Sequence, residues 1–253
     1  IMAGIQVPDV FNHPDLPQGE SVADALLLDT GLDHWFQSDY EFVTLNGKDI
    51  ISFNDRVTAT AKLNRAGENN GASLLNNLFS GYPGARFNSA ESDRSMFNGS
   101  TPDLTHTFSW TGIATLRTLA ASSNLCGTFS TSTVRTIINV SVGGNNPGKI
   151  AFLYGTSSCY GPVLDLNTPF VFACGYDGEN IFLRVNGETV SAVAAGSPSA
   201  SQFALGALPG GDQFWNGDVG DFFMCNVALN APEGAGLLKK FIEYYKTTYG
   251  LNL

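Results

Sequence analysis

Apolar and polar residues alternate along much of the chain, most regularly between residues 169 and 194. Three strand-like runs lie there, spanning residues 169–176, 180–185 and 188–194, and the middle run shows the period of two clearly, with Ile181, Leu183 and Val185 on one face. Asp177-Gly178 separates the first two runs and Asn186-Gly187 the last two, and such pairs tolerate the positive φ angles of tight hairpin turns. The pattern therefore predicts a three-stranded antiparallel meander.

Similar runs lie before and after this meander. A hairpin is predicted over residues 41–55, because two β-rich runs flank Asn46-Gly47. Further strands are predicted at residues 106–116, 134–142, 148–155 and 201–208 and within residues 214–230. Residues 62–101 are polar and rich in turn formers, which indicates a long connection around short strands.

The last part of the chain changes to a helical period. Asn230 is a suitable N-cap, and Pro232 follows in the first turn, where a missing N–H costs nothing. Apolar side chains then recur at helical spacing; they are Leu237, Leu238, Phe241, Ile242, Tyr245 and Tyr249. Gly250 is a natural stop. We expect an amphipathic helix over residues 232–249 that packs against the sheets.

The two ends of the chain differ in organisation. Residues 1–20 contain Pro8, Pro14 and Pro17 and little periodicity, which predicts an extended N-terminal arm that packs on a neighbour or on its own domain. Residues 21–253 are long enough, and at 43% hydrophobic residues apolar enough, to form one domain with a sizeable core.

A C-terminal pattern resembles the laminin-G-like, concanavalin A-like jelly-roll family. The residues that fit it are Phe214, Gly217, Val219, Asp221, Asn226, Leu229, Tyr245, Tyr249 and Gly250. The resemblance is close over residues 170–250 and looser over 40–250. It implies an all-β fold, an antiparallel jelly-roll β-sandwich with a short C-terminal helix. The helix that ends in Tyr-Gly looks most like the versions carried by bacteriophage virion proteins and by bacterial surface proteins.

Charge and composition exclude some partners. Only 14% of residues are charged and the net charge is −10, so a phosphate backbone would repel the chain and nucleic acid is not an expected partner. No apolar stretch reaches the length of a membrane span, and no signal peptide is visible. The four cysteines, Cys126, Cys159, Cys174 and Cys225, form no CxxC pair, and we expect buried free thiols.

The sequence offers little catalytic or metal chemistry. The best candidate for a paired-carboxylate site is Glu91 and Asp93, but Met96 stands where glucanases of this fold need a third carboxylate. Asp218 and Asp221 are three apart on a strand and should face opposite ways, with one solvated and the other held by backbone donors. No other catalytic motif and no set of metal ligands stands out. We therefore expect no catalytic residue, no cofactor and no metal, and hence no enzyme.

Sugar binding is the site hypothesis that the residues favour. Loops at the rim of a sandwich can present amides and carboxylates to sugar hydroxyls, and aromatic rings to sugar faces. The candidate ligand-binding residues are Asn145, Asn146, Tyr160, Asp212, Gln213 and Trp215. Trp35 and Trp110 lie in apolar or strand contexts and are expected in the core.

These features lead to a non-enzymatic structural and adhesion module on a phage particle, as a head fibre, capsid decoration or tail-associated protein that binds host-surface glycans. It would lie on the virion surface, and its partners would be other virion proteins or copies of itself. A homotrimer is the oligomeric state that we expect. An alternative is a bacterial secreted or surface carbohydrate-binding module. A third interpretation, a jelly-roll glycoside hydrolase, would need Glu91 or Asp93 to act.

Overall fold

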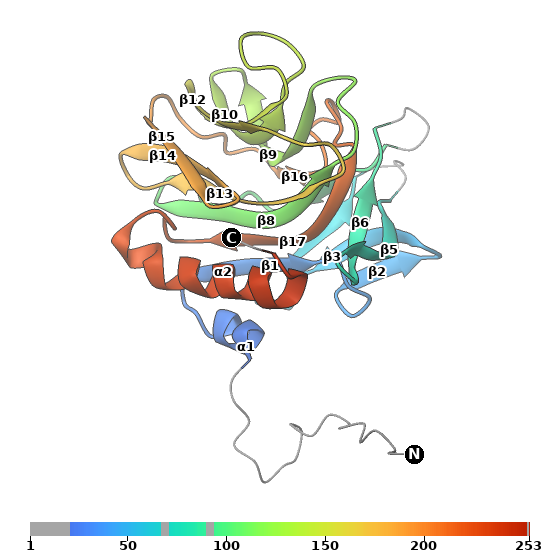
Figure 1. The fold of residues 1–253 in the computed structure, drawn as a ribbon. Coiled ribbons are helices and arrows are strands. Elements are labelled where there is room, and N and C mark those ends of the chain that lie inside the picture. The colour runs from blue at the N-terminus through green and yellow to red at the C-terminus, as the bar shows by residue number, and fades with distance from the viewer. Residues whose placement is uncertain (1–20, 67–70, 90–93, 252) are drawn as a thin grey trace, which may run out of the picture.

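A computed structural model describes residues 21–66, 71–89, 94–251 and 253. The predicted arm at residues 1–20 lies outside the described residues, and so do Glu91 and Asp93. The described chain folds as two antiparallel sheets that face each other, with a helix across the outer side of one of them (Figure 1). This architecture confirms the predicted antiparallel β-sandwich with a short C-terminal helix.

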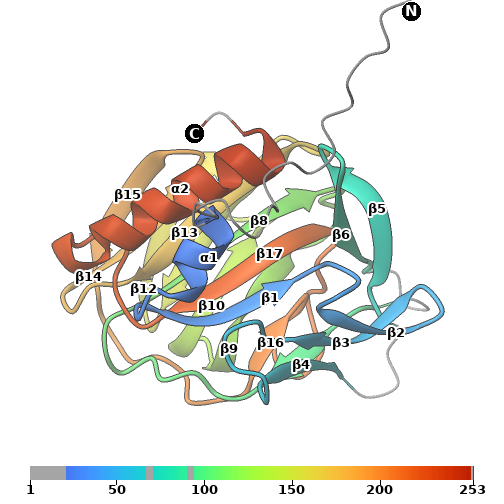
Figure 2. The same cartoon turned by 90° about the horizontal axis from the view of Figure 1, so that it is seen from below.

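We call the sheet under the C-terminal helix the helix-side sheet. Its order is β15-β14-β13-β8-β17, after which β1 pairs with one half of β17 and β6 with the other half, followed by β5. The strands are β1 (Leu32–Gln37), β5 (Ser73–Phe79), β6 (Tyr82–Phe87), β8 (Phe108–Leu116), β13 (Pro169–Tyr176), β14 (Asn180–Val185), β15 (Glu188–Val193) and β17 (Gly217–Cys225). Figure 2 shows this sheet from the helix side.

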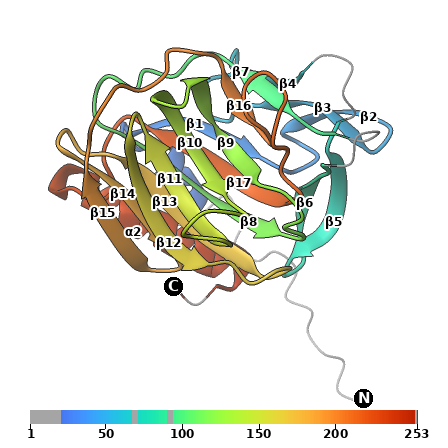
Figure 3. The ribbon, with the colours of Figure 1, turned by 90° about the horizontal axis from the view of Figure 1, so that it is seen from above.

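The opposite layer, here called the far sheet, has the order β12-β11-β10-β9-β16-β7-β4-β3-β2 (Figure 3). Its strands are β2 (Val43–Asn46), β3 (Asp49–Asn54), β4 (Lys62–Arg65), β7 (Phe97–Gly99), β9 (Ser123–Thr131), β10 (Val134–Val140), β11 (Lys149–Tyr154), β12 (Ser157–Val163) and β16 (Phe203–Leu205). One pairing between Asp49 of β3 and Ser73 of β5 joins the two sheets at an edge.

The main core fills the space between the sheets and is rich in aromatic rings. Trp110, Phe152, Phe172, Phe203 and Phe222 are all within a few per cent of full burial. Trp110 meets Phe203 edge to face with ring centroids 5.4 Å apart, an arrangement that aromatic pairs prefer. β8 is buried along its whole length, because one of its faces meets this core and the other lies under the helix.

Two helices form a second core on the outer side of the helix-side sheet. α2 (Ala235–Tyr249) lies along that sheet, and α1 (Val22–Leu27) packs beside α2 (Figure 2). Gly250 ends α2 in the left-handed conformation, with φ of 64°, as the sequence predicted.

The start of the helical region differs from the prediction in one respect. Residues 232–234 form a 3₁₀ turn ahead of α2, so the predicted range is helical throughout. Asn230 is not the N-cap. Its amide donates instead to the carboxylate of Asp177 at 2.9 Å, which ties the entry of the helix to the β13–β14 turn.

A β-bulge in β17 corrects the expectation for Asp218 and Asp221. The pairing of β17 with β8 shifts between Val219 and Phe222, which adds a residue to one face. Val219 and Phe222 both contact the main core, so Asp218 and Asp221 both point to the helix side rather than to opposite faces. Neither is solvated, since both are buried.

Candidate functional site

A polar pocket of about 300 Å³ lies at one rim of the sandwich. Two loops form most of it, one between β8 and β9 and the other between β16 and β17. The described residues that line it are Ser89, Arg94, Thr118, Ala120, Ala121, Ser122, Ser123, Asp212, Gln213, Phe214 and Asn216. We call this cavity the rim pocket. Its volume is at the lower end of the range for small-molecule sites.

Glycine and backbone hydrogen bonds set the course of the loop that carries Asp212 and Gln213. Gly206 begins the loop at φ of 90°, and a Cβ there would come within 2.4 Å of the Phe87 ring, so only glycine fits. The backbone N–H and the side-chain amide of Asn124 in β9 donate to the backbone and side-chain carbonyls of Gln213, each at 2.8 Å. Gln213 is therefore held against the far sheet at the edge of the pocket.

Two buried polar atoms of the rim pocket have no hydrogen-bond partner in the part of the chain that the structure describes. The Arg94 guanidinium lies over the Phe214 ring, 5.0 Å from its centroid, and its buried Nε has no hydrogen-bond partner among the described residues. Asn216 donates to Ser89 Oγ at 3.1 Å, while its buried Oδ1 accepts no hydrogen bond from the described chain. Because buried polar groups are nearly always paired in folded proteins, each of these two atoms calls for an explanation.

The structure brings two of the six predicted ligand-binding residues together. Asp212 and Gln213 both line the rim pocket, and Asp212 Oδ1 accepts from the Gln213 N–H at 2.7 Å. Asn145 and Asn146 lie in the β10–β11 loop, which approaches the pocket edge through a hydrogen bond from Val142 N–H to Ser122 Oγ at 3.3 Å. They do not line the pocket themselves.

Tyr160 and Trp215 are not part of the pocket. Tyr160 lies on β12 with 43% of its surface exposed. Trp215 is 0% exposed, so the expectation that its indole stacks on a sugar at the rim is wrong. Its backbone N–H donates to the Gly206 carbonyl at 2.7 Å, and its side chain packs in the main core. The neighbouring ring of Phe214 lines the pocket instead. Trp35 and Trp110 are buried as predicted.

Arg94, Ser122 and Asn216 line the pocket but were not singled out from the sequence. Arg94 falls in the turn-rich segment before β7, where no periodicity predicts the position of a side chain. Ser122 and Asn216 lie immediately before β9 and β17. The sequence feature that points to Ser122 and Asn216 is their position directly before a strand, because the ends of the strands form the rim of a sandwich.

The buried carboxylate of Asp221 has a different environment. Tyr244 and Tyr249 of α2 each donate a hydroxyl to its Oδ2 at 2.7 Å, and the Trp35 indole N–H donates to its Oδ1 at 3.2 Å. Burial raises the pKa of Asp221 and outweighs these hydrogen bonds, which favour the charged form. With no exposed surface and three donors in place, Asp221 fastens the helix to the sheet and cannot reach a substrate.

Asp218 is likewise engaged. Arg86 of β6 donates to both of its carboxylate oxygens, at 2.8 and 3.1 Å, in the two-point geometry that makes arginine–carboxylate pairs strong. The ion pair holds β6 beside the first half of β17. Asp218 and Asp221 therefore both serve the fold.

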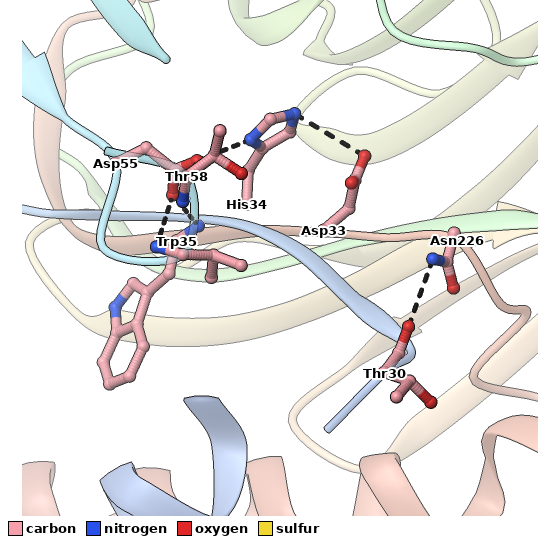
Figure 4. A network of polar contacts seen from close by, with 8 residues as sticks. Thr30, Asp33, His34, Trp35, Asp55, Thr58 and Asn226 are labelled. Atoms are coloured by element: carbon pink, nitrogen blue, oxygen red, sulfur yellow. Dashed lines mark hydrogen bonds and ion pairs between the residues drawn. The ribbon is translucent and has the colours of Figure 1, made fainter. Parts of the chain in front are cut away.

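His34 in β1 is placed between two carboxylates (Figure 4). Its Nδ1 lies 2.7 Å from Asp55 Oδ2, and its Nε2 lies 3.5 Å from Asp33 Oδ2. Asp55 also accepts from the backbone N–H groups of Trp35 and Thr58, which fixes the turn after β3 against β1. Burial alone would lower the pKa of His34, but the Asp55 hydrogen bond and the two negative charges raise it overall.

Other candidates are apolar or lack ligands. A groove of about 450 Å³ between the start of α2 and β13–β14 is lined mainly by apolar groups such as Phe182, Leu229 and Leu238. In the part of the chain that the structure describes, no three His, Cys, Asp or Glu side chains converge to hold a metal ion. The four cysteines are free and buried, as expected. Neither α-helix of the described chain has the length and apolar character to cross a bilayer.

Comparison with known proteins shows the fold but not a family. No family model matches the chain, and no curated protein matches it. A Trypanosoma rangeli sialidase in complex with the inhibitor DANA is similar to 81% of this chain, with a TM-score of 0.58 and 16% identity. Domain 4 of AbnA, a GH43 extracellular arabinanase from Geobacillus stearothermophilus, was solved with arabinotriose. It is similar to 80% of this chain over 95% of its own length, at a TM-score of 0.57 and 14% identity.

The binding domain of botulinum neurotoxin DC, in complex with rat synaptotagmin II, is also similar. The match covers 83% of this chain and 51% of that one, with a TM-score of 0.57 and 10% identity. The chain spans about a third, 32%, of the length of the sialidase that it matches. At these identities the likeness shows a shared β-sandwich, and it lends no support to the expected place on a phage particle.

The prediction that the chain is not an enzyme is contradicted by these neighbours. The fold occurs in sialidases and in a domain of a GH43 arabinanase, so the structural kin of this chain include carbohydrate-active enzymes. The expectation depended on the lack of one arrangement of paired carboxylates on one strand. One sandwich fold can serve different activities, and the lack of that single motif excludes none of the others.

Proposed function

We propose that this chain is a carbohydrate-binding domain that holds its ligand in the rim pocket. The observation that carries the proposal is a polar lining in which Arg94 Nε and Asn216 Oδ1 have no hydrogen-bond partner among the described residues. Sugar hydroxyls both donate and accept hydrogen bonds, so they can satisfy carboxylate, amide, hydroxyl and guanidinium groups together. Asp212, Gln213, Asn216 and Ser122 supply such groups at the wall of the pocket.

The similar structures support this choice of ligand class. One was solved with arabinotriose bound to a domain that this chain matches over nearly its whole length, and another is a sialidase solved with sialic acid. The neurotoxin domain, by contrast, was solved with a protein partner. The polar lining of the rim pocket favours the sugar over the protein ligand, because protein interfaces concentrate apolar and aromatic side chains at their centre.

Binding of the purified chain to a glycan array, followed by calorimetry, tests the proposal. We expect Asp212→Ala and Asn216→Ala each to weaken binding about tenfold, the effect of losing about one hydrogen bond of 1.4 kcal/mol. Asp165→Ala removes an aspartate that lines a different cavity and is the matched control. Failure of every array glycan to bind, or equal binding by the pocket variants and the control, would contradict the proposal.

The biological setting is a separate proposal that the sequence resemblance supports. It places the domain on the surface of a phage particle, with other virion proteins or copies of this chain as partners, and a bacterial surface module is the alternative. The low content of charged residues suits extensive protein contact. Copurification of the chain with phage particles would support the first setting, and its recovery from bacterial surfaces free of phage would support the second.

A further inference from the structure

Arg94 differs from most arginines of the described chain in having no polar partner. Others are engaged: Arg86 with Asp218, Arg56 with Gln37, Arg117 with Phe87 and Asn88, Arg135 with Gly155, and Arg184 with Thr189. Within the described residues, neither a hydrogen bond nor an ion pair involves Arg94. A guanidinium carries five N–H donors, and in a protein of net charge −10 a carboxylate partner would be readily found.

The Phe214 ring holds this guanidinium at the pocket. The cation lies 5.0 Å from the ring centroid, within the distance at which a ring face attracts a positive charge. Phe214 is itself 7% exposed and packs with Met96 and Ala204, so it forms a fixed base. Stacking of this kind positions the guanidinium without using its N–H donors, and since Nε is buried, the two terminal nitrogens are the donors that a ligand can meet.

We propose that the rim pocket selects glycans that carry a carboxylate, and that Arg94 binds this carboxylate. The inference rests on the proposed function, since it names the class of glycan for the same pocket. The planar fork of arginine matches a carboxylate through two parallel N–H···O hydrogen bonds, a geometry that neutral sugar hydroxyls cannot reproduce. Asn216, Gln213 and Ser122, which line the same pocket, then form hydrogen bonds with the hydroxyl groups of that sugar.

Asp212 is compatible with an anionic ligand. No ion pair within 4.0 Å joins it to any described arginine or lysine, and one of its oxygens already accepts from the Gln213 N–H. Its side chain is exposed, so solvent screens its charge. Because the whole chain is strongly acidic, an anionic glycan gains no general attraction from it, and the preference has to arise at Arg94 itself.

A matched set of ligands tests the inference on the wild-type protein. Trigalacturonate and its methyl ester differ only at the carboxyl groups, which the ester carries methylated and uncharged, and calorimetry compares their affinities at one ionic strength. Sialyllactose and lactose form a second pair, which distinguishes a terminal acidic sugar from a uronic acid as the source of the carboxylate. We expect at least one acidic member to bind about 10- to 100-fold more tightly than its neutral counterpart.

Variants of Arg94 locate the effect. Arg94→Gln should abolish the preference for the acid, so that the acidic and neutral members of a pair bind with equal affinity. Arg94→Lys keeps the charge but loses the two-point geometry, and it should retain a smaller preference. Arg184→Gln, which changes an arginine outside the pocket, should retain the full preference. Circular dichroism of each variant shows whether it is folded.

The outcomes separate this inference from the function on which it rests. Equal affinity for acidic and neutral members, or a preference that survives in Arg94→Gln, overturns the carboxylate inference while carbohydrate binding stands. If neither these saccharides nor any array glycan binds, the proposed function fails and this inference fails with it.

Discussion

The loop and strand from Gly206 to Cys225 pass through two polar regions with opposite properties. At the rim pocket, Arg94 and Asn216 have polar atoms with no partner among the described residues. At the other region, five residues after Asn216 and so about 17 Å further along the strand, Asp221 accepts from three side-chain donors and is fully buried. The carboxylate of Asp221 thus has its donors within the protein, whereas Arg94 Nε and Asn216 Oδ1 have no partner among the described residues.

This comparison assigns stability to one region and recognition to the other. Substitutions around Asp221 should change the free energy of unfolding and leave intrinsic glycan affinity alone. Substitutions in the rim pocket should do the reverse. The predictions below test that division, beginning with the largest expected effect.

Trp215→Ala should cost about 3–5 kcal/mol of unfolding free energy, because it removes a fully buried indole and leaves a cavity. Urea denaturation followed by fluorescence measures the change. At temperatures where the variant is folded, its glycan affinity should equal that of the wild type. If the Trp215→Ala protein were as stable as the wild type but no longer bound glycan, Trp215 would be part of the binding site, and this prediction would be wrong.

Asp221→Ala should cost about 3 kcal/mol or more, because it leaves the hydroxyls of Tyr244 and Tyr249 and the Trp35 N–H buried without an acceptor. Asp212→Ala is the matched change in the rim pocket, and it should alter the unfolding free energy by less than about 0.5 kcal/mol. If urea denaturation showed the same loss of unfolding free energy for both substitutions, the assignment of stability to one region and recognition to the other would be contradicted.

His34→Gln should destabilise the protein by about 1 kcal/mol at pH 5.5 and by less at pH 9. The raised pKa of His34 means that the folded state holds the proton more tightly than the unfolded state, whose pKa is near 6.5. The stabilisation is therefore complete below about pH 6.5 and is lost as pH rises through the folded pKa. Urea midpoints measured across this range should show the difference, and a constant difference would contradict it.

Arg94→Gln should have the smallest effect on stability, within about 0.5 kcal/mol of zero, because the side chain has no hydrogen bond to lose. Arg86→Gln is the contrasting change. It breaks the pair with Asp218 and should destabilise by about 1.5–3 kcal/mol. Thermal unfolding of the two variants side by side measures this contrast, and a larger loss in Arg94→Gln would mean that Arg94 serves the fold.

The fold was predictable where the pattern is local. The Asp177-Gly178 and Asn186-Gly187 turns fixed the β13–β15 meander, and the apolar stripe identified the C-terminal helix. The bulge near Asp221 was not predictable, because it arises where β17 adjusts its register against β8. Nothing in the alternation of apolar and polar residues along one strand records that adjustment.

The site was predictable in part for a similar reason. Asp212 and Gln213 lie in a turn-rich loop just before a strong strand, a position that places them at the rim. Trp215 lies only two residues further on, but its burial follows from the contact of its backbone with Gly206. Arg94 reaches the pocket from a segment more than a hundred residues away, and only the packing of β7 against β16 brings the two together.

The most direct test of the account is to map a bound oligosaccharide on the protein by nuclear magnetic resonance. The ligand is the tightest-binding glycan of the array, titrated into isotope-labelled chain. We predict that the shift changes cluster at Ser122, Asp212, Gln213 and Asn216. Changes that cluster instead at Tyr160, or in the groove between α2 and β13–β14, would contradict the assignment of the rim pocket.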